Sequence, residues 1–228
     1  GFLETLKVVW EHRLTTLADP PAMRRSPQEE LGSETLDRMA EDARRGLRSP
    51  QKGRIVAPDP LLGTAHLAAA DSEGNLIAWT QTHGGGFGSK VMVAGTEIVL
   101  GHGMCRFEPR QGWANSVAPG KRPLHNMAPV LVLRDGKPLA AVGAAGGRTI
   151  INNVSSVTFH LIFDGMEPVD AVQAPRLQCE TIEPARLELK AGQQVADALR
   201  ARGHEVTEVQ RDPGVAHVIH QAPKGWIA

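Results

Sequence analysis

The spacing of apolar residues first changes from helical to strand-like at a proline-rich stretch. Residues 1–50 have helical spacing, and Leu36 and Met39 begin an apolar face in a helix expected to start at Ser33. Residues 49–62 suit neither a helix nor a central strand, because they contain Ser-Pro-Gln-Lys-Gly-Arg and then Pro-Asp-Pro. Beyond this linker, short apolar runs alternate with turn signals, as in strands. The order predicts an α+β or layered fold rather than a regular βαβ array.

Turn and capping signals divide the chain further. The run Ser26-Pro27-Gln28-Glu29 has a capping serine, a proline at the first helical position and a glutamate whose side chain can accept the backbone N–H of the serine, as in a capping box. Asp135-Gly136 is a strong hairpin signal. Strands are expected at 65–71, 76–82, 91–100, 130–133, 139–142, 186–190, near 206 and at 215–220, and helices at 146–163, 169–173 and 193–201.

Composition excludes several classes of partner. Lys plus Arg and Asp plus Glu each total 25, so no net field favours nucleic acid or an anionic membrane. No apolar run approaches the roughly 20 residues that a membrane span needs. Cys105 and Cys179 are expected to be ordinary thiols, because two cysteines make neither a disulfide framework nor a metal motif. The chain lacks an initiator Met and stops within an expected strand, so we expect a fragment, and its cellular compartment cannot be read from it.

Thr64 opens the first strand after the linker. The β propensity of threonine alone explains such a position. If Gly74 takes the left-handed position of a three-residue loop, however, Asp71 pairs with Asn75 and Thr82 faces Thr64. The Cβ atoms of the two threonines are then roughly 5 Å apart, close enough for one hydroxyl to orient the other. A four-residue loop would put them on opposite faces of the hairpin.

A threonine hydroxyl is a weak nucleophile unless a base activates it. The free α-amine of the same residue can serve, since its pKa near 8 suits a base. Thr64 must then become an N-terminus, and Gly63 supplies the bond to be cut, because a residue without Cβ permits a strained backbone. The sequence therefore predicts self-cleavage between Gly63 and Thr64.

Acyl transfer also needs donors for a developing oxyanion. Residues 143–147, Gly-Ala-Ala-Gly-Gly, lie between an expected strand and an expected helix and offer unobstructed N–H groups at the positive end of a helix dipole. A tight packing turn is the simpler interpretation of these glycines.

Other motifs carry less weight. His83-Gly84-Gly85-Gly86 is similar to an oxyanion motif of α/β-hydrolases, but no Gly-x-Ser-x-Gly follows. Residues 88–90 reverse the order of a phosphate-binding loop, so residues 84–88 are expected to form a flexible loop beside the substrate. No zinc is expected, because the nearby pair His217 and His220 would point to opposite faces of one strand. His66 is expected to be a hydrogen-bonded structural histidine rather than a proton carrier.

The order of the motifs resembles that of the γ-glutamyltranspeptidase family. GTAHLAAADSEGNLIAWTQT is similar to the start of that family's small subunit, and GKRPLHNMAP and GAAGGRTI are similar to two further family motifs. The resemblance implies an N-terminal-nucleophile (Ntn) hydrolase with an αββα four-layer sandwich, of which residues 1–63 are the large-subunit tail and 64–228 most of the small subunit. It implies the roles of nucleophile for Thr64, supporting hydroxyl for Thr82 and oxyanion hole for Gly146 and Gly147.

The chain departs from the family where side chains hold the γ-glutamyl donor. Gly84 replaces an asparagine, Gly103 a glutamine, Arg106 an aspartate, and His125-Asn126 a pair of serines, whereas Arg122 of GKRP is expected to be structural. A guanidinium in place of the aspartate would repel the donor's ammonium group and favour a carboxylate. The departures leave the acylation machinery but argue against glutathione as the substrate.

The resemblance implies a self-processing amidohydrolase or acyltransferase without a cofactor or metal. It would pass a γ-glutamyl or related acyl group from Thr64 to water, an amino acid or a peptide. Its expected partners are a small amide substrate and the remainder of the large subunit, with no nucleic acid or membrane. The alternative is a degenerate family member that binds a ligand without turnover.

Overall fold

A computed structural model describes residues 1–46 and 63–228, so the whole of the predicted linker, residues 49–62, lies outside the described residues. The described residues form two compact units. Unit 1 contains 1–46, 103–125 and 177–210, and unit 2 contains 63–102, 126–176 and 211–228. Both units thus take segments that are distant in sequence, and unit 1 combines residues from both sides of the predicted boundary at Gly63.

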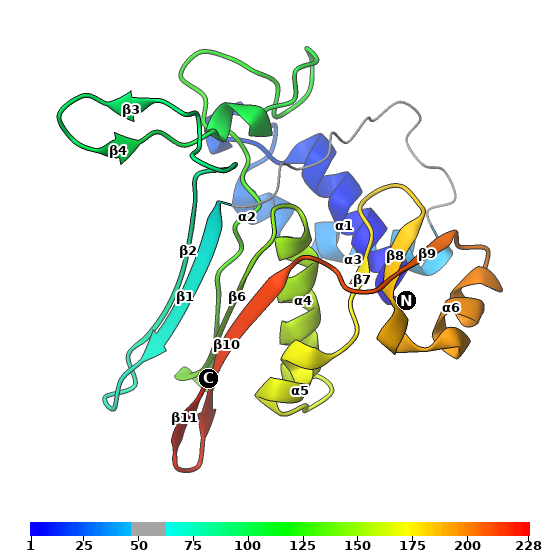
Figure 1. Ribbon diagram of the computed structural model, residues 1–228. Coiled ribbons are helices and arrows are strands. Elements are labelled where there is room, and N and C mark those ends of the chain that lie inside the picture. Colours follow the sequence, from blue (N-terminus) through cyan, green and yellow to red (C-terminus); the bar gives the residue numbers. More distant parts are fainter. Residues whose placement is uncertain (47–62) are drawn as a thin grey trace. The chain divides into compact units, whose positions relative to one another are not determined.

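The described residues of unit 2 form three antiparallel sheets, two of which build the stack around the predicted nucleophile (Figure 1). A hairpin of two strands contains the predicted nucleophile, and a second sheet of four strands has the order β11-β10-β6-β5. The elements are β1 (Thr64–Ala70), β2 (Leu76–Thr82), β5 (Val130–Arg134), β6 (Lys137–Ala145), α4 (Thr149–Ile162), α5 (Pro168–Gln173), β10 (Val215–Ala222) and β11 (Gly225–Ile227).

The core of unit 2 lies between the four-stranded sheet and α4. Val142 and Ala144 of β6 pack against Ile150 and Val154 of α4 because alternate residues of a strand face the same side. The opposite face of β6 receives the β1–β2 hairpin, where Gly143 lies against the ring of His66. Unit 2 is therefore a helix–sheet–sheet stack, which confirms the α+β class and contains three layers of the αββα sandwich.

The turn of the β1–β2 hairpin sets its register. Asp71 pairs with Asn75, and Gly74 has a φ of +87°, as expected for a three-residue loop with a left-handed residue. The Asp71 carboxylate accepts the N–H groups of Glu73 and Asn75, each at 2.9 Å. Thr64 consequently faces Thr82 across the hairpin, which confirms the predicted pairing.

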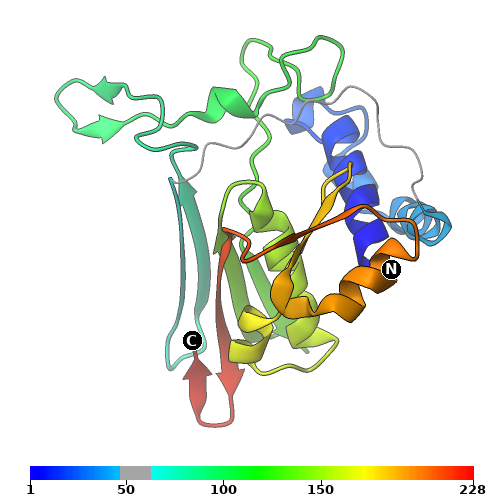
Figure 2. The same ribbon diagram turned by 45° about the vertical axis from the view of Figure 1, so that its right-hand side comes forward.

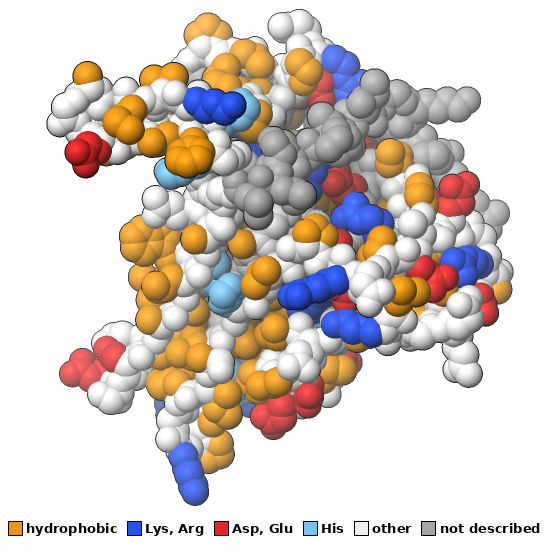
Figure 3. Space-filling model, viewed as in Figure 1, with side chains coloured by type: hydrophobic (Ala, Val, Ile, Leu, Met, Phe, Trp, Pro, Cys, Tyr) orange, Lys and Arg blue, Asp and Glu red, His pale blue; other side chains and the backbone are white. Residues whose placement is uncertain are grey.

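The single strand expected at 91–100 is wrong. Two strands of two residues, β3 (Met92–Val93) and β4 (Ile98–Val99), form a hairpin there, because Thr96 closes a turn with its hydroxyl on the carbonyl of Val93. Apolar residues alone could not reveal this turn, since they continue on both of its sides. Side chains of the hairpin remain exposed, among them Met92 and Ile98, and they appear as orange patches at the upper left of Figure 3.

Unit 1 combines helices with a three-stranded sheet of order β7-β8-β9, in which β8 and β9 are parallel. The strand expected at 186–190 ends at Glu188 and continues as a 3-10 turn. The elements are α1 (Phe2–Thr16), η1 (Pro20–Ala22), α2 (Pro27–Glu30), α3 (Ser33–Arg45), η2 (Gly103–Arg106), β7 (Leu177–Gln178), β8 (Ala185–Glu188), η3 (Leu189–Ala191), α6 (Gln193–Arg200) and β9 (Val206–Val209).

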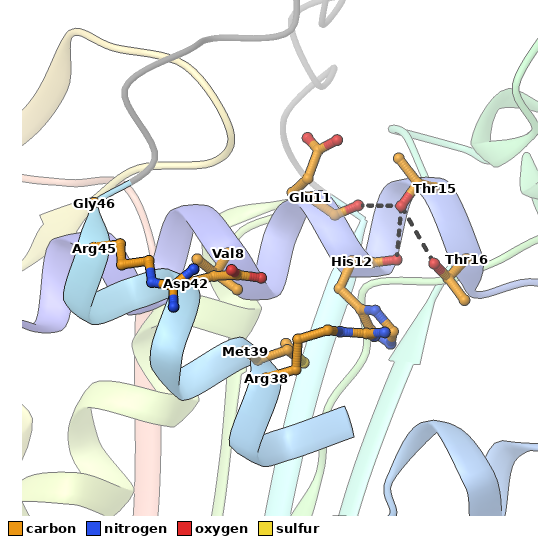
Figure 4. A pocket seen from close by; sticks show the side chains of 10 residues that line it. All are labelled: Val8, Glu11, His12, Thr15, Thr16, Arg38, Met39, Asp42, Arg45 and Gly46. Carbon is orange, nitrogen blue, oxygen red and sulfur yellow. Dashed lines mark hydrogen bonds between the residues drawn. The ribbon is translucent and has the colours of Figure 1, made fainter. Parts of the chain in front are cut away.

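Two helices of unit 1 begin where their sequence signals predict, at Pro27 and Ser33, but the apolar face expected for α3 is not buried. The capping box is confirmed, because Ser26 accepts the N–H of Glu29 while the Glu29 carboxylate accepts that of Ser26. On α3 the most buried residue is Thr35, whose hydroxyl donates to the carbonyl of Glu29, whereas Leu36 of the expected apolar face is 49% exposed. A groove of about 570 Å³ runs between α1 and α3 (Figure 4).

Neither Cys105 nor Cys179 takes part in a disulfide among the described residues. Cys179 packs with Leu3 and Ala185 in the core of unit 1, and burial raises the pKa of its thiol to about 12. Such a thiol stays protonated and unreactive near neutral pH. No helix among residues 1–46 and 63–228 is long and apolar enough to cross a membrane.

Candidate active site

The two predicted threonines form a hydroxyl pair at the open end of the β1–β2 hairpin. The Oγ1 atoms of Thr64 and Thr82 are 2.8 Å apart, within hydrogen-bonding distance. The N–H of Gly84 donates to Thr82 Oγ1 at 2.9 Å, so the supporting hydroxyl is itself held by backbone. The arrangement fixes the direction of the Thr64 hydroxyl without using a charged group.

The carbonyl that precedes Thr64 is held by the same loop. The N–H of His83 donates to the oxygen of Gly63 at 2.8 Å. A Cβ at residue 63 would lie 2.7 Å from the carbonyl oxygen of Gly85, a distance that real side chains do not reach. The position before Thr64 therefore requires a glycine, because the backbone of Gly85 approaches it too closely for a side chain. The N–H of His83 also polarises the Gly63 carbonyl, which self-cleavage would attack.

The glycines after His83 form a packed turn. Gly84, Gly85 and Gly88 are buried, and the N–H of Gly88 donates to the carbonyl of Gly85. A Cβ on Gly88 would lie 2.2 Å from the carbonyl oxygen of Leu100. Residues 84–88 were predicted to form a flexible loop beside the substrate. In the structure, close backbone packing requires glycine at residue 88 of this loop.

His66 lies beneath the hydroxyl pair on the inner face of the hairpin. Its Nδ1 is 2.8 Å from the hydroxyl of Thr80, and its Nε2 is buried without a hydrogen-bond partner among the described residues. A Cβ on Gly143 would come within 2.0 Å of the ring. Burial, and then the nearby His217, lower the pKa of His66, so the ring is neutral. These contacts support the structural role expected for His66.

The glycine turn between β6 and α4 lies at the same end of unit 2 as the start of β1 (Figure 2). His66 packs over Gly143, and β1 and β6 run in opposite directions. Thr64 precedes His66 on β1, and Gly146 follows Gly143 at the end of β6, so the two residues lie toward the same end of the stacked sheets. Gly146 and Gly147 have φ values of +136° and +61° and lead into the N-terminus of α4. Backbone N–H groups at a helix N-terminus can stabilise a developing oxyanion.

The positive φ values of Gly146 and Gly147 alone would also fit a tight packing turn without oxyanion donors. A Cβ on Gly146 would lie 2.7 Å from Thr149 Oγ1 and 2.8 Å from the Cα of Gly214. The hydroxyl of Thr149 also donates to the carbonyl of Gly146. The turn is hence fixed by packing, a condition that any preorganised donor site must meet.

Three of the residues expected to bind substrate come together in unit 1. The position of a Cβ on Gly103 is 3.5 Å from His125 Nε2, an ordinary van der Waals distance, so Gly103 and the imidazole are neighbours. Burial, followed by the positive charges of Arg106 and Arg13, lowers the pKa of His125. A neutral imidazole beside two guanidinium groups can accept a hydrogen bond and can tolerate an anion.

The neighbours of His125 are well anchored. Arg122 is structural, as expected, because Asp19 accepts both its backbone N–H at 3.0 Å and its Nε–H at 2.8 Å. Arg13 donates to the carbonyl of His125 at 2.8 Å. The remaining residues of the predicted set, Gly84 and Asn126, are buried and belong to unit 2.

Two contacts of the site were not anticipated from the sequence, those of His83 N–H with Gly63 and of Gly214 with Gly146. A Gly before the nucleophile and three more after His83 were visible signals of close backbone approach. Gly214 carried no signal, because it lies far along the chain.

Comparison with known proteins agrees with this geometry. The chain is 33% identical over 228 residues to the acylase ACY 1 proenzyme of Pseudomonas sp. (strain SE83), covering 98% of this chain and 40% of that protein. It is 35% identical over 142 residues to the glutathione hydrolase proenzyme of Bacillus subtilis (strain 168), covering 62% of this chain and 24% of the relative. The chain thus spans less than half the length of these relatives.

Solved structures show the same fold. A cephalosporin acylase from Bacillus halodurans matches 99% of this chain and 41% of its own, with a TM-score of 0.83 and 25% identity. A mutant of Helicobacter pylori γ-glutamyltranspeptidase matches 71% of this chain and 94% of its own, with a TM-score of 0.63 and 29% identity. The family model described as gamma-glutamyltranspeptidase matches residues 1–228. With the hydroxyl pair and the glycine turn in their expected elements, the chain belongs to the γ-glutamyltranspeptidase family.

Proposed function

We propose that this chain is the catalytic part of a self-processing amidohydrolase or acyltransferase whose nucleophile is Thr64. The observation that carries the proposal is the 2.8 Å hydrogen bond between Thr64 and Thr82 next to a Gly63 carbonyl that His83 N–H already holds. Nucleophile, orienting hydroxyl and polarised carbonyl are the three parts that an acyl shift requires.

Self-cleavage would proceed by an N-to-O acyl shift. The hydroxyl oxygen of Thr64 attacks the carbonyl carbon of Gly63, and the charge that develops on the carbonyl oxygen is stabilised by His83 N–H. The C–N bond breaks, and the released amine of Thr64 takes up the hydroxyl proton. Water then hydrolyses the ester, which leaves a carboxylate on Gly63 and both a free amine and a hydroxyl on Thr64.

The same hydroxyl would act on substrate. The new α-amine of Thr64 accepts the hydroxyl proton while the oxygen attacks an amide carbonyl, and the leaving amine then receives that proton. The N–H groups of Gly146 and Gly147 serve as oxyanion donors in this second reaction. Water, an amino acid or a peptide completes the cycle by taking the acyl group from Thr64.

Intact mass tests the proposal. The protein containing this chain should separate into two fragments at the bond between Gly63 and Thr64, and Thr64→Ala should remain whole and inactive, since hydroxyl and amine belong to one residue. Thr64→Ser should still cleave because it keeps the hydroxyl. Thr96→Ala, which removes a hydroxyl from the β3–β4 turn, is the control and should cleave normally. Normal cleavage of Thr64→Ala would rule the nucleophile out.

We further propose that the acyl donor ends in a carboxylate and lacks an α-amine, as a glutaryl amide does. The support is the pair of guanidinium groups of Arg106 and Arg13 near the neutral His125, together with the family's aspartate being replaced by Arg106. The relatives named as acylases fit a donor other than glutathione. A charge-assisted pair with carboxylate typically gains about 1.5–3 kcal/mol, enough to decide between donors.

Matched anilides test the donor class. Rates on glutaryl and γ-glutamyl anilides should favour the glutaryl compound in the parent, and Arg106→Asp should shift the preference toward the γ-glutamyl compound. Arg134→Asp, in a strand of unit 2, controls for the change of net charge. A parent that prefers the γ-glutamyl anilide, with no shift in the Arg106 variant, would contradict the charge inversion.

We also propose that the remainder of the large subunit covers the outer face of the β1–β2 hairpin. Leu67 and Ile77 on that face are exposed, and Trp79 is 57% exposed, which is unusual for neighbouring large apolar residues. The relatives are proenzymes more than twice as long as this chain. Hydrogen exchange of the hairpin in the whole protein should show protection of this face.

A further inference from the structure

One buried amide joins the two segments of unit 1 that carry Arg106 and His125. Asn115 is 8% exposed. Its Nδ2 donates to the carbonyl of Arg106 at 2.7 Å, and its Oδ1 accepts the N–H of Leu124 at 3.2 Å. The first partner can only accept and the second can only donate, so the orientation of the amide is fixed.

The backbone around Asn115 is itself held in place. Its carbonyl accepts the N–H of Glu108 at 2.9 Å. The Lys121 ammonium donates to the carbonyls on either side, those of Ala114 and Ser116. The side chain therefore cannot follow a displaced partner, and it acts as a rigid link between two peptide groups.

The two linked peptide groups lie directly beside the proposed donor-binding residues. Arg106 ends the four-residue turn η2, which begins at Gly103, and Leu124 precedes His125. The Cβ position of Gly103 is 3.5 Å from His125 Nε2, so the two segments are in close register. A shift of η2 would move the Arg106 guanidinium relative to the imidazole.

We infer that Asn115 is a positioning residue for donor specificity. It fixes the turn that carries Arg106 to the loop that carries His125, so that guanidinium and imidazole face the donor's carboxylate as one rigid pair. The inference rests on the proposed donor site. Misplacement by about 1 Å at such a site can cost a large factor in binding or rate, and loss of the link affects recognition of the donor rather than acyl transfer at Thr64.

Asn115→Ala, compared with Ser116→Ala, tests the inference. Ser116 is a matched control, because it is 7% exposed and its hydroxyl also bridges two backbone groups, of Trp113 and Arg110, that carry no donor-binding side chain. Asn115→Ala should raise KM for a glutaryl anilide about tenfold or more while kcat stays within about threefold. Cleavage at Gly63 should be retained. Ser116→Ala should lower the unfolding midpoint comparably yet leave KM near that of the parent.

Equilibrium binding separates this inference from the proposed function. Calorimetry with glutarate needs no turnover, and Asn115→Ala should weaken glutarate binding about tenfold relative to the parent and to Ser116→Ala. Equal loss in both variants, or unchanged KM and glutarate affinity in Asn115→Ala, would overturn the positioning role. An inactive parent that still shows the calorimetric difference would refute the nucleophile and leave the role of Asn115 intact.

Discussion

At the scale of the residue, the site depends on glycines that no other residue can replace. Gly63 must approach Gly85, Gly143 makes room for His66, and Gly146 lies against Gly214. Each position lacks space for a Cβ, so backbone groups come closer than side chains would allow. Close backbone approach supplies hydrogen-bond donors without any charged group, and this fits a site whose base is the amine of the nucleophile itself.

Gly147→Val tests the oxyanion donors. Turnover should fall roughly a hundredfold or more with a modest change in KM, because such donors act mainly on the transition state. The matched control is Gly136→Val, since Gly136 has a similar φ of +74° in the β5–β6 turn but no atom near its Cβ position. If the Gly147 variant lost only affinity, or if both variants lost turnover alike, the glycines would be no more than a packing turn.

At the scale of the element, the hairpin turn sets the register in which Thr64, the proposed nucleophile, faces Thr82. Gly74→Ala forces a side chain into the left-handed region at about 1 kcal/mol and should slow self-cleavage severalfold, because the turn sets the register of Thr64. Gly95→Ala is the control: it has a φ of +76° and equally open surroundings, but it lies in the β3–β4 hairpin. Cleavage rates followed by mass spectrometry should differ between the two variants, and equal rates would contradict the role of the turn.

The same hairpin shows how far sequence reasoning reaches. The pairing of Thr64 with Thr82 was predictable, because Asp71, Gly74 and Asn75 are local signals for one turn type. The β3–β4 turn was not, because its closing hydrogen bond from Thr96 follows no strong turn dipeptide. The bounds of elements that local turn or capping residues specify could therefore be predicted from the sequence.

Contacts between residues far apart in the sequence are not specified by such local signals. The link from Asn115 to Arg106 and Leu124 joins groups that no periodicity relates, and the pairing of Asp19 with Arg122 joins residues 103 positions apart. The residues of the candidate site could be named from motifs that resemble a family. The side chains that hold them could not, because they depend on packing that only the folded chain defines.

At the scale of the whole molecule, an ionic cluster ties α1 to the segments near Glu183 in unit 1. The Lys7 ammonium and His204 Nδ1 both contact the Glu183 carboxylate, which also accepts the N–H of Glu205 at 2.6 Å. Burial alone would raise the pKa of Glu183, but these hydrogen bonds hold it below its ordinary value of 4.5. A depressed carboxyl pKa contributes stability that is present above the ordinary value and is lost as the pH falls through the folded one.

Glu183→Gln tests this cluster. At pH 7 the variant should lose about 1–3 kcal/mol of unfolding free energy, since Lys7 remains buried with a weaker partner. The difference from the parent should shrink as the pH falls below about 4.5, because the Glu183 carboxyl of the unfolded parent binds a proton there before that of the folded parent does. Urea unfolding across this range measures both effects. A difference that stays constant with pH would show that the carboxylate charge is not what stabilises α1.

The contact of Gly146 with Gly214 also has a consequence for timing. On the ribosome, Thr64 and the glycine turn emerge well before Gly214 and the β10 strand that pairs with β6. The nascent polypeptide therefore carries the proposed nucleophile while Gly214, which packs against the turn, is still being synthesised, and the edge of β6 that pairs with β10 is still unpaired. If the proposed site is correct, the glycine turn is complete only after residues beyond 214 have emerged, and we expect no acylation at Thr64 before almost the whole of this segment has been translated.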